Sequence, residues 1–382
     1  MEYREMVLDD IVNIRTGKLN SNAAVENGEY VFFTCAPEPL RIDKYKYDQA
    51  AILLAGNNAD GNFHINYFEG KFEVYQRTYI IDSKDTEKYD LRYIFYALKE
   101  CLSEFKSMSQ GTSTKFLTMA ILKAFNLKIP DIDLQRKISQ ILLMIDEKIK
   151  CNNQINRNLS EQLDSLYSEL STCQKWEYVA IDELADKIAM GPFGSNIKVS
   201  TFVERGIPII SGNHLRGHFL EEPSYNYITE EHAEKLKNSN VYPKDVIFTH
   251  AGNIGQVAMI PDDSEYDRYV ISQRQFYLRC NLEKVLPEYV TLFFHSNEGQ
   301  QELLSYANQV GVPSIAQPVK NLKKIQIPLP PIDVQREWLT IVKPMISLHQ
   351  KTSKENKRLV LLRDSLLPKL MSGRLDVSEL DI

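Results

Sequence analysis

The sequence predicts an α+β protein: two similar α+β domains separated by two long antiparallel coiled-coil helices, with a pseudo-two-fold internal repeat. Three observations predict it. Residues 111–170 match residues 311–370 without a gap, at a constant separation of 200 positions. Both copies carry apolar residues at helical spacing, and the stretches before them mix strand-like runs with turn residues. The predicted order is domain 1 (1–131), spacer helix 1 (132–174), domain 2 (175–331), and spacer helix 2 with a C-terminal tail (332–382).

The repeat has one strong part and several weaker ones. Leu122–Arg136 matches Leu322–Arg336, and both copies contain Ile-Asp-x-Gln-Arg. Shorter matches upstream need gaps, and taken alone they are equally compatible with chance similarity. They pair Leu8–Ile11 and Gly17 with Ile181–Leu184 and Gly191, Ala55–Asn57 with Ala251–Asn253, and Tyr75–Arg77 with Ser272–Arg274.

Domain 1 is expected to combine strands with a helix. Runs rich in β-branched and aromatic residues predict strands at 51–54, 72–75 and 78–81. Residues 91–105 read as a helix that is rich in aromatic side chains on one face.

Spacer helix 1 has apolar residues at steps of three and four after Ile132, which predict a long amphipathic helix. Each helix follows a proline-bearing turn that cannot continue it, so Asp133 and Asp333 are predicted N-caps. The middle of the stripe is polar, which weakens the seam there and favours one register. It carries Asn152, Asn153 and Asn156.

Domain 2 repeats the mixed pattern, with strands at 246–248 and 275–278 and a helix at 287–306. Polar loops are expected between these elements, and such loops on a rigid scaffold are where recognition usually lies. They are 191–195, 212–214 and 251–255.

Spacer helix 2 carries a second leucine stripe, and Gly373 is the expected helix stop. Pro344 predicts a kink or a break in its first third. A helix of about 37 residues is roughly 55 Å long, and its apolar stripe needs a partner. Two copies in one chain can bury each other, most simply as an antiparallel pair. The alternative is that each helix covers only its own domain.

The composition is that of a soluble globular protein, at 43% hydrophobic, 25% charged and 10% aromatic residues. Neither a membrane span nor a secretory signal is evident, so a cytoplasmic location is expected. The five scattered cysteines form no CxxC pair and are interpreted as idle thiols. A net charge of −6 argues against a protein that grips DNA unaided.

Two patterns suggest catalytic or metal chemistry only formally. Pro130-Asp131 followed by Asp146-Glu-Lys148 fits a nuclease pattern, but Asp146 lies on a predicted helix. His214 and His218 have ligand spacing without an evident third ligand. No phosphate-binding Gly-Lys-Ser/Thr run and no methyltransferase tetrapeptide occurs. We therefore expect a protein that is not an enzyme and holds neither a metal nor a cofactor.

At this point the residues resemble a known family. Pro328–Arg336, followed by Leu362–Leu375, closely resembles the helical regions of type I restriction–modification specificity subunits. Gly191-Pro-Phe-Gly-Ser195 and Arg205-Gly-Ile-Pro208 resemble their target-recognition domains. Domain 1 departs from the pattern: Asp131 stands where proline is usual, and no such glycine-rich phrase follows Gly17.

The resemblance implies a subunit that reads an asymmetric, two-part site in double-stranded DNA. It also implies two adenine methyltransferase subunits, which bring S-adenosylmethionine, and motor-nuclease subunits for cleavage. The alternative is an interaction scaffold, or a lone regulatory subunit, that binds methyltransferase without reading DNA.

Base readers should be polar loop residues able to form paired hydrogen bonds. In domain 2 the candidates are Ser195, Asn196, Lys198, Asn213, His214, Arg216, His250, Asn253, Gln273 and Arg274. In domain 1 they are Lys18, Asn20, Asn57, Asn58, Asn62 and His64.

Overall fold

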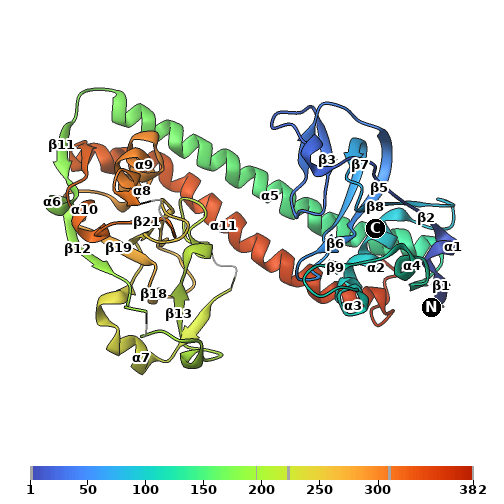
Figure 1. Ribbon diagram of the computed structural model, residues 1–382. Coiled ribbons are helices and arrows are strands. Elements are labelled where there is room, and N and C mark those ends of the chain that lie inside the picture. The colour runs from blue at the N-terminus through green and yellow to red at the C-terminus, as the bar shows by residue number, and fades with distance from the viewer. Residues whose placement is uncertain (1–2, 195, 222–223, 309–310, 381–382) are drawn as a thin grey trace. The chain divides into compact units, whose positions relative to one another are not determined.

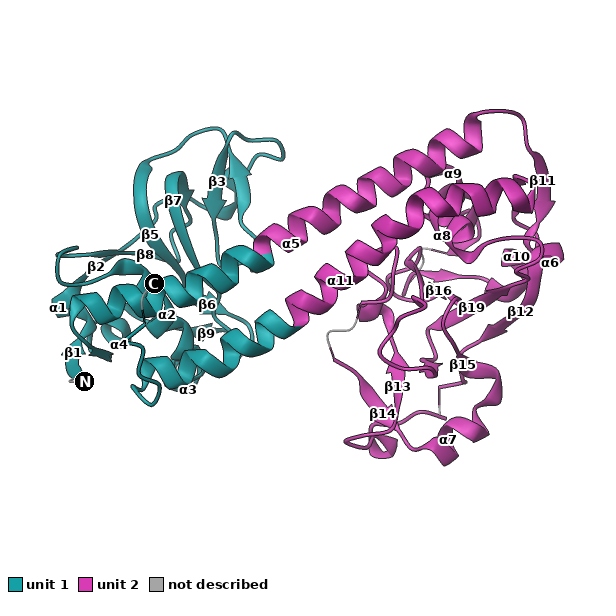
Figure 2. Cartoon of the chain, turned by 180° about the vertical axis from the view of Figure 1, so that it is seen from behind, with its two compact units in different colours: residues 1–149, 358–382 teal, residues 150–357 magenta. Residues whose placement is uncertain are grey.

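A computed structural model describes residues 3–194, 196–221, 224–308 and 311–380. The chain divides into two compact units: unit 1 comprises residues 1–149 and 358–382, and unit 2 comprises residues 150–357 (Figures 1 and 2). Helices α5 (Ile132–Thr172) and α11 (Ile332–Met371) each contribute a segment to both units. None of the helices in the described ranges is apolar over a stretch long enough to cross a bilayer.

Unit 1 is built on a six-stranded sheet with the order β2-β8-β5-β7-β3-β4, in which only β3 and β7 pair in parallel. Two further ladders join β1 to β10 and β6 to β9. The strands are β1 (Arg4–Val7), β2 (Val12–Thr16), β3 (Tyr30–Phe33), β4 (Leu40–Ile42), β5 (Tyr47–Ala55), β6 (Asn57–Asn58), β7 (Ile65–Val74), β8 (Thr78–Ser83), β9 (Lys115–Phe116) and β10 (Asn126–Ile129). The short helices are α1 (Leu8–Ile11), η1 (Ser21–Ala23), α2 (Leu91–Glu100), α3 (Leu102–Met108) and α4 (Met119–Lys123).

The core of unit 1 forms where one face of this sheet meets α2 and both long helices. Ile52 and Ile81 of the sheet are fully buried beside Tyr93 of α2. The first turns of α5 and the last turns of α11 complete the core, with Leu134, Ile138, Leu142, Leu367 and Leu370. The apolar stripe of each long helix is therefore buried against a domain as well as in the seam.

Unit 2 contains two four-stranded sheets, with the orders β12-β19-β16-β17 and β14-β13-β18-β15, and the two-stranded ladders β11-β22 and β20-β21. The strands are β11 (Glu177–Ala180), β12 (Ala185–Met190), β13 (Ile207–Ile210), β14 (Asn226–Ile228), β15 (Asn240–Val241), β16 (Val246–Thr249), β17 (Val257–Met259), β18 (Tyr269–Ile271), β19 (Gln275–Cys280), β20 (Ala307–Asn308), β21 (Ser314–Ile315) and β22 (Gln326–Leu329). The short helices are α6 (Ile181–Leu184), η2 (Val199–Thr201), η3 (Gly212–His214), α7 (Glu230–Lys235), η4 (Lys237–Ser239), α8 (Pro287–His295), α9 (Asn297–Leu304) and α10 (Pro318–Leu322). In the main core of unit 2, helix α8 packs against both long helices, through Leu163 and Tyr167 of α5 and Trp338 and Val342 of α11.

The two units repeat the same joint between domain and helix. The Gln135 side chain accepts a hydrogen bond from Asp90 N (2.9 Å) and donates to Lys88 O and Pro130 O. Gln335 likewise accepts from Leu286 N (2.9 Å) and donates to Lys284 O and Pro330 O. Both glutamines are buried, and each pairs its side chain with three backbone groups that lie partly or fully inside the unit.

The entry strands also correspond. Arg4 pairs with Ile129 in unit 1, and Glu177 pairs with Leu329 in unit 2, in the same antiparallel register. The next strand differs by one residue, because β12 has a β-bulge between Ala185 and Lys187 that β2 lacks.

The helices form the expected antiparallel seam within each unit. In unit 2 the seam is polar: Asn152 donates to Asn356 Oδ1 (2.9 Å), and Asn156 donates to Ser353 Oγ (3.0 Å). In unit 1, Arg363 Nη1 lies 2.9 Å from Asp146 Oδ1. Partner numbers fall along α11 as they rise along α5. The predicted polar middle of the stripe is thus confirmed.

The predicted strands all lie in or overlap β5, β7, β8, β16 and β19. The structure corrects three expectations about the helices, one of them only in part. The N-cap of α5 is Asp131, whose Oδ1 accepts from Leu134 N, and Asp133 and Asp333 lie inside the first turn. Of the kink or break expected at Pro344, the break is excluded, because helix α11 continues through this residue.

The third correction concerns the single helices expected at 91–105 and 287–306. Each is two helices, interrupted at Cys101 and at Ser296. Ser296 Oγ accepts from Gly299 N and starts α9 as its cap. At the end of α11, Gly373 adopts a φ of 73° just beyond the last helical residue, as the expected stop should.

Candidate nucleic-acid interface

The two units share a tight turn that we call the arginine turn, residues 75–78 in unit 1 and 272–275 in unit 2. Thr78 N donates to Tyr75 O, and Gln275 N donates to Ser272 O. In unit 1, Thr78 O also accepts a hydrogen bond from Gly17 N (3.3 Å). In unit 2, Gln275 O accepts one from Gly191 N (2.8 Å). Each unit therefore closes the same hydrogen-bonded frame.

Glycine is required beside the arginine turn. A Cβ atom on Gly17 would lie 2.0 Å from Val74 O, and one on Gly191 would lie 2.0 Å from Ser272 O. The predicted correspondence of these two glycines is confirmed.

A second loop holds the other side of the turn. Arg77 O accepts from Gly56 N (2.8 Å), and Arg274 O accepts from His250 N (2.9 Å). In the same way, Gly56 O accepts from Leu117 N and His250 O accepts from Ile315 N. Gly56 therefore corresponds to His250 and not to Gly252, so the Ala-Gly-Asn match between the domains is two residues out of register.

Several candidates of domain 2 lie around this frame. Gln273, Arg274 and Asn253 are exposed. His250 is half-buried, with Nε2 3.1 Å from Gln273 O, and burial lowers its pKa, so the ring is neutral at pH 7. The frame thus presents one cation and neutral polar groups.

Loop 211–216 carries the next candidates. Asn213 and Arg216 are exposed, but His214 is only 4% exposed and stacks on Tyr225 with ring centroids 4.6 Å apart. Its Nδ1 accepts from Ser211 N (2.9 Å), so Nε2 carries the proton and donates to Ser224 O (2.8 Å). With both ring nitrogens engaged, His214 supports the loop and has no free group for a base.

Loop 191–198 carries three further candidates. Asn196 and Lys198 are exposed, and Ser195 lies outside the described residues. Sequence reasoning missed Phe193, whose side chain is 83% exposed. Its position in the glycine-rich phrase was the available signal, because an aromatic residue in a polar loop is a common recognition anchor.

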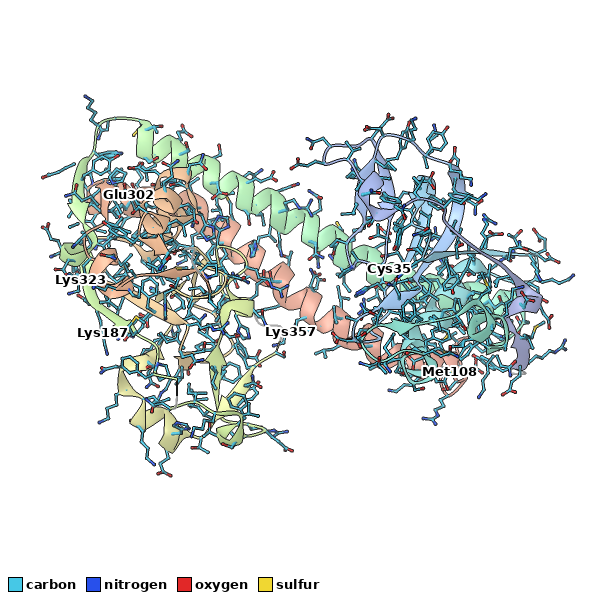
Figure 3. All side chains as sticks on the ribbon, viewed as in Figure 1. Cys35, Met108, Lys187, Glu302, Lys323 and Lys357 are labelled. Atoms are coloured by element: carbon cyan, nitrogen blue, oxygen red, sulfur yellow. The ribbon has the colours of Figure 1, made fainter. Side chains whose placement is uncertain are left out.

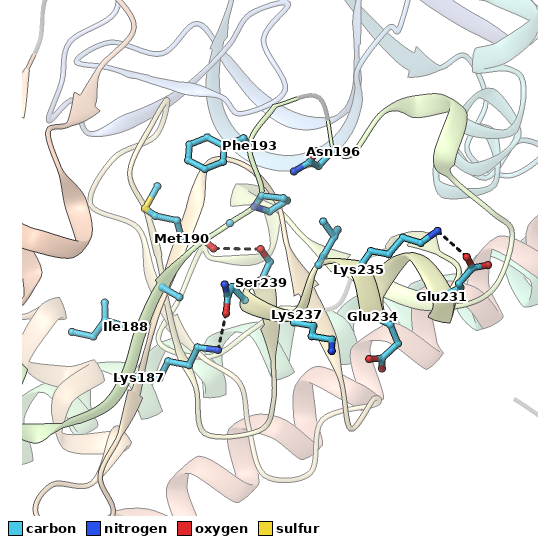
Figure 4. Close-up of a pocket in the computed structure, with 15 residues that line it drawn as sticks. Lys187, Ile188, Met190, Phe193, Asn196, Glu231, Glu234, Lys235, Lys237 and Ser239 are labelled. Carbon is cyan, nitrogen blue, oxygen red and sulfur yellow. Dashed lines mark hydrogen bonds and ion pairs between the residues drawn. The ribbon is translucent and has the colours of Figure 1, made fainter.

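Next to this loop is a groove with a volume of about 980 Å³, between β12 and α7 (Figure 4). Its charges are largely paired: Lys235 lies 2.7 Å from Glu231, and Glu234 lies 2.7 Å from Arg268. Lys187 contacts Asn238 at 3.5 Å. Paired charges leave little attraction for phosphate, so the groove is a weaker DNA candidate than the exposed loops.

The candidates of domain 1 separate into free and engaged side chains. Lys18 and Asn20 are exposed, and Asn20 Oδ1 accepts from Gln76 Nε2 (2.8 Å) of the arginine turn. Asn58 Oδ1 accepts from the backbone of Asp60 and of Asn62, which makes it a turn-forming residue.

The remaining candidates of domain 1 lie next to that turn. Asn57 pairs with Phe116 in the β6–β9 ladder, and Asn62 Oδ1 accepts from Lys106 Nζ (2.8 Å). His64 is half-buried, and its backbone oxygen accepts from Ala55 N. The structure therefore brings Lys18, Asn20 and Asn57 to the arginine turn.

Two basic features of unit 1 escaped prediction. Arg77 is exposed, with its guanidinium 5.9 Å from the centre of the Phe116 ring. Beside it, Cys35, labelled in Figure 3, donates from Sγ to Arg77 O (3.3 Å). The second is a lysine–tyrosine pair, in which Lys71 Nζ lies 4.8 Å over the Tyr45 ring.

The residues that suggested nuclease or metal chemistry have structural contacts. Asp131 caps α5, and Asp146 accepts from Tyr96 OH (2.8 Å) besides its ion pair with Arg363. His218 Nε2 lies 2.8 Å from Asp164 Oδ1. Within the ranges that the structure describes, no three His, Cys, Asp or Glu side chains are grouped to hold a metal ion.

Comparisons with known proteins agree with this architecture. The model of the "Type I restriction modification DNA specificity domain" family matches residues 1–161 and 174–359. The specificity subunit of the Escherichia coli type I restriction enzyme EcoDI is 29% identical over 142 residues, which is 37% of this chain but only 31% of that subunit. The MjaVIII specificity subunit of Methanocaldococcus jannaschii is 22% identical over 86% of this chain and 80% of its own.

A solved structure shares the fold. The type I restriction–modification S subunit from M. genitalium superposes with a TM-score of 0.64 at 16% identity, over 99% of this chain and 97% of that one. The family model covers most of the sequence in two parts, one per repeat. The chain therefore belongs to the family of type I restriction–modification specificity subunits, which are non-catalytic DNA-recognition subunits.

Proposed function

We propose that this chain reads an asymmetric, two-part DNA site, one half with each unit, for a type I restriction–modification complex. The observation that carries the proposal is the arginine turn: one backbone frame presents different neighbours in the two units. Asn20 and Asn57 lie at the turn of unit 1, whereas His250 and Asn253 lie at that of unit 2. Because bases are distinguished by their hydrogen-bonding groups, unlike side chains imply unlike half-sites.

The proposal includes partners. Two methyltransferase subunits, one for each repeat, would carry S-adenosylmethionine and modify adenine, and motor-nuclease subunits would join for cleavage. In this arrangement the lengths of α5 and α11 set the number of unread base pairs between the half-sites. The net charge of −6 supports a shared grip on DNA, because phosphate contacts dominate affinity and the partners would supply most of them.

The test is to produce the chain with the methyltransferase encoded beside it and to map methylated adenines. The expected result is one bipartite motif, and the double variant Asn213→Ala/Arg216→Ala should relax one half of it. The matched control is Asn158→Ala/Arg157→Ala on α5. An intact complex that modifies no defined sequence contradicts the proposal and favours the scaffold. Retention of the full motif in the double variant excludes that loop only.

A second measurement tests the shared grip. The isolated chain should bind DNA weakly and with little discrimination, whereas the complex should bind its site tightly. Tight, site-specific binding by the purified chain alone would contradict this part of the proposal.

A further inference from the structure

We propose that Arg77 and Arg274 bind DNA phosphates at equivalent positions of the two half-sites, independently of base sequence. This inference rests on the proposed function and assigns a positioning role to two residues within it.

The backbone of both arginines is fixed in the same way. The arginine turn is closed by its own hydrogen bond, held on one side by Gly17 or Gly191 and on the other through the carbonyl of the arginine itself. In both units the residue that follows the arginine, Thr78 or Gln275, is 1% exposed and anchors the turn in the sheet. Because the turn fixes the backbone of the arginine before binding, less conformational entropy is lost when the guanidinium binds.

The side chains, by contrast, have no carboxylate partner. Neither Arg77 nor Arg274 is in an ion pair with any residue of the described ranges, and both are exposed. Two arginines on strands of the two sheets are paired, by contrast: Arg15 Nη1 lies 2.6 Å from Asp82 Oδ2, and Arg279 Nη2 lies 2.6 Å from Asp245 Oδ2. In an acidic chain, two equivalent arginines without internal partners are sites for an external anion.

Their repetition indicates which anion. A residue that occurs at the same place in both units is suited to a feature that the half-sites share whatever their sequences. The phosphodiester backbone is that feature, since contacts to it fix register without carrying sequence information. The planar guanidinium also matches phosphate oxygens with two parallel hydrogen bonds.

The neighbours of the turns support this assignment. Phe116 lies beside the Arg77 guanidinium, and Gly252 approaches Arg274, where an added Cβ would lie 3.4 Å from Nη1. Both surroundings support the guanidinium without neutralising it. The residues that precede the arginines, Gln76 and Gln273, are exposed and neutral, so they add no competing charge.

The experiment uses the complex with methyltransferase and measures DNA affinity from low to high salt. Arg77→Ala and Arg274→Ala should each weaken binding several-fold on the methylated motif and on shuffled DNA alike. Each should lower the slope of log affinity against log salt by about 0.9, the value of one phosphate contact. The methylated motif should stay the same. Arg77→Lys and Arg274→Lys should recover the slope but only part of the affinity, because lysine keeps the charge and loses the paired hydrogen bonds. Arg157→Ala on α5 should leave the slope unchanged.

Three outcomes would overturn the inference. An unchanged salt slope in both alanine variants removes the phosphate contact. An altered motif shows that the arginine reads a base. Loss of methyltransferase from the purified complex, with normal DNA binding by the complexes that remain, shows a contact to the partner protein. Failure of the wild-type complex to methylate any motif would instead defeat the proposed function, and it would do so before any variant is compared.

Discussion

Units 1 and 2 attach their helices in the same way but close the helix seam differently. The Gln135 and Gln335 joints make the same set of hydrogen bonds. At the seam, however, unit 1 has the ion pair of Asp146 and Arg363, and the repeat places Ile346 and Leu163 at the corresponding positions of unit 2. The joint keeps the same residue in both units because only glutamine makes this set of hydrogen bonds to the backbone. The seam can change, because either an ion pair or a pair of apolar side chains fills it.

The largest effect is expected at the joints. Gln135→Ala and Gln335→Ala each leave one backbone N–H and two backbone carbonyls, partly or fully buried, without their partner, and each should lower the free energy of unfolding by about 3 kcal/mol. Urea unfolding of the full chain measures it. Gln154→Ala, on the exposed side of α5, should change stability by less than about 0.5 kcal/mol. A large loss at only one joint would show that the two are not equivalent.

The seam gives a medium effect with a clear reversal. Asp146→Ala removes the partner of the half-buried Arg363 and the acceptor of Tyr96 OH, which should cost about 2 kcal/mol. The double variant Asp146→Ile/Arg363→Leu copies the seam of unit 2. It should recover about half of that loss, because a packed apolar pair can replace a buried ion pair, whereas Tyr96 OH still lacks its acceptor. A double variant as unstable as the single one would mean that the ion pair is required in unit 1.

The smallest expected effect is a difference between the two units in how their stability depends on pH. Burial, and next the neighbouring His218, lower the pKa of His295 to about 4, and His349 is lowered to about 4 by the same causes. The unfolded chain takes up these protons near pH 6.5, so unit 2 loses stability as pH falls from about 6.5 towards 4. Unit 1 has Lys99 and Ile149 at the corresponding positions and should not follow.

For His295 alone the loss between pH 7 and pH 5.5 is about 1 kcal/mol. This loss is measured by thermal unfolding at both pH values, monitored with a separate probe in each unit. His295→Gln, which can still donate to Val257 O, should flatten the dependence. The assignment to His295 is contradicted if this variant keeps the pH dependence of the parent and if both units lose stability equally in acid.

The fold was largely predictable because its signals are local or repeated. The stripes of α5 and α11, the strong repeat and the central strands follow from spacing alone. The helix breaks at Cys101 and Ser296 did not. The break at Ser296 depends on its serine cap and on close packing of Gly299, where an added Cβ would lie 2.0 Å from Phe293 O. The N-cap was missed by two residues for a related reason: the choice between Asp131 and Asp133 is made by backbone geometry.

The site was predictable as a set of loops but not residue by residue. Asn213, Arg216 and Asn253 are exposed as base readers must be, and their roles stay predictions. His214 shows the limit of composition, since a polar residue in a polar loop is here the buried support of that loop. Arg77 was passed over because its repetition suggested a structural task. In the structure, the backbone of Arg77 has the structural role, because its carbonyl holds the turn, and its side chain is exposed.

The β-bulge between Ala185 and Lys187 has a consequence for how such chains change. The path from Ile181 to Gly191 is one residue longer than the path from Leu8 to Gly17, yet both glycines arrive at the same turn. An irregular strand can therefore absorb an insertion before the chain reaches its recognition loops. A one-residue insertion between Ile11 and Gly17 should therefore be absorbed as a bulge of β2, and Gly17 should still reach the arginine turn.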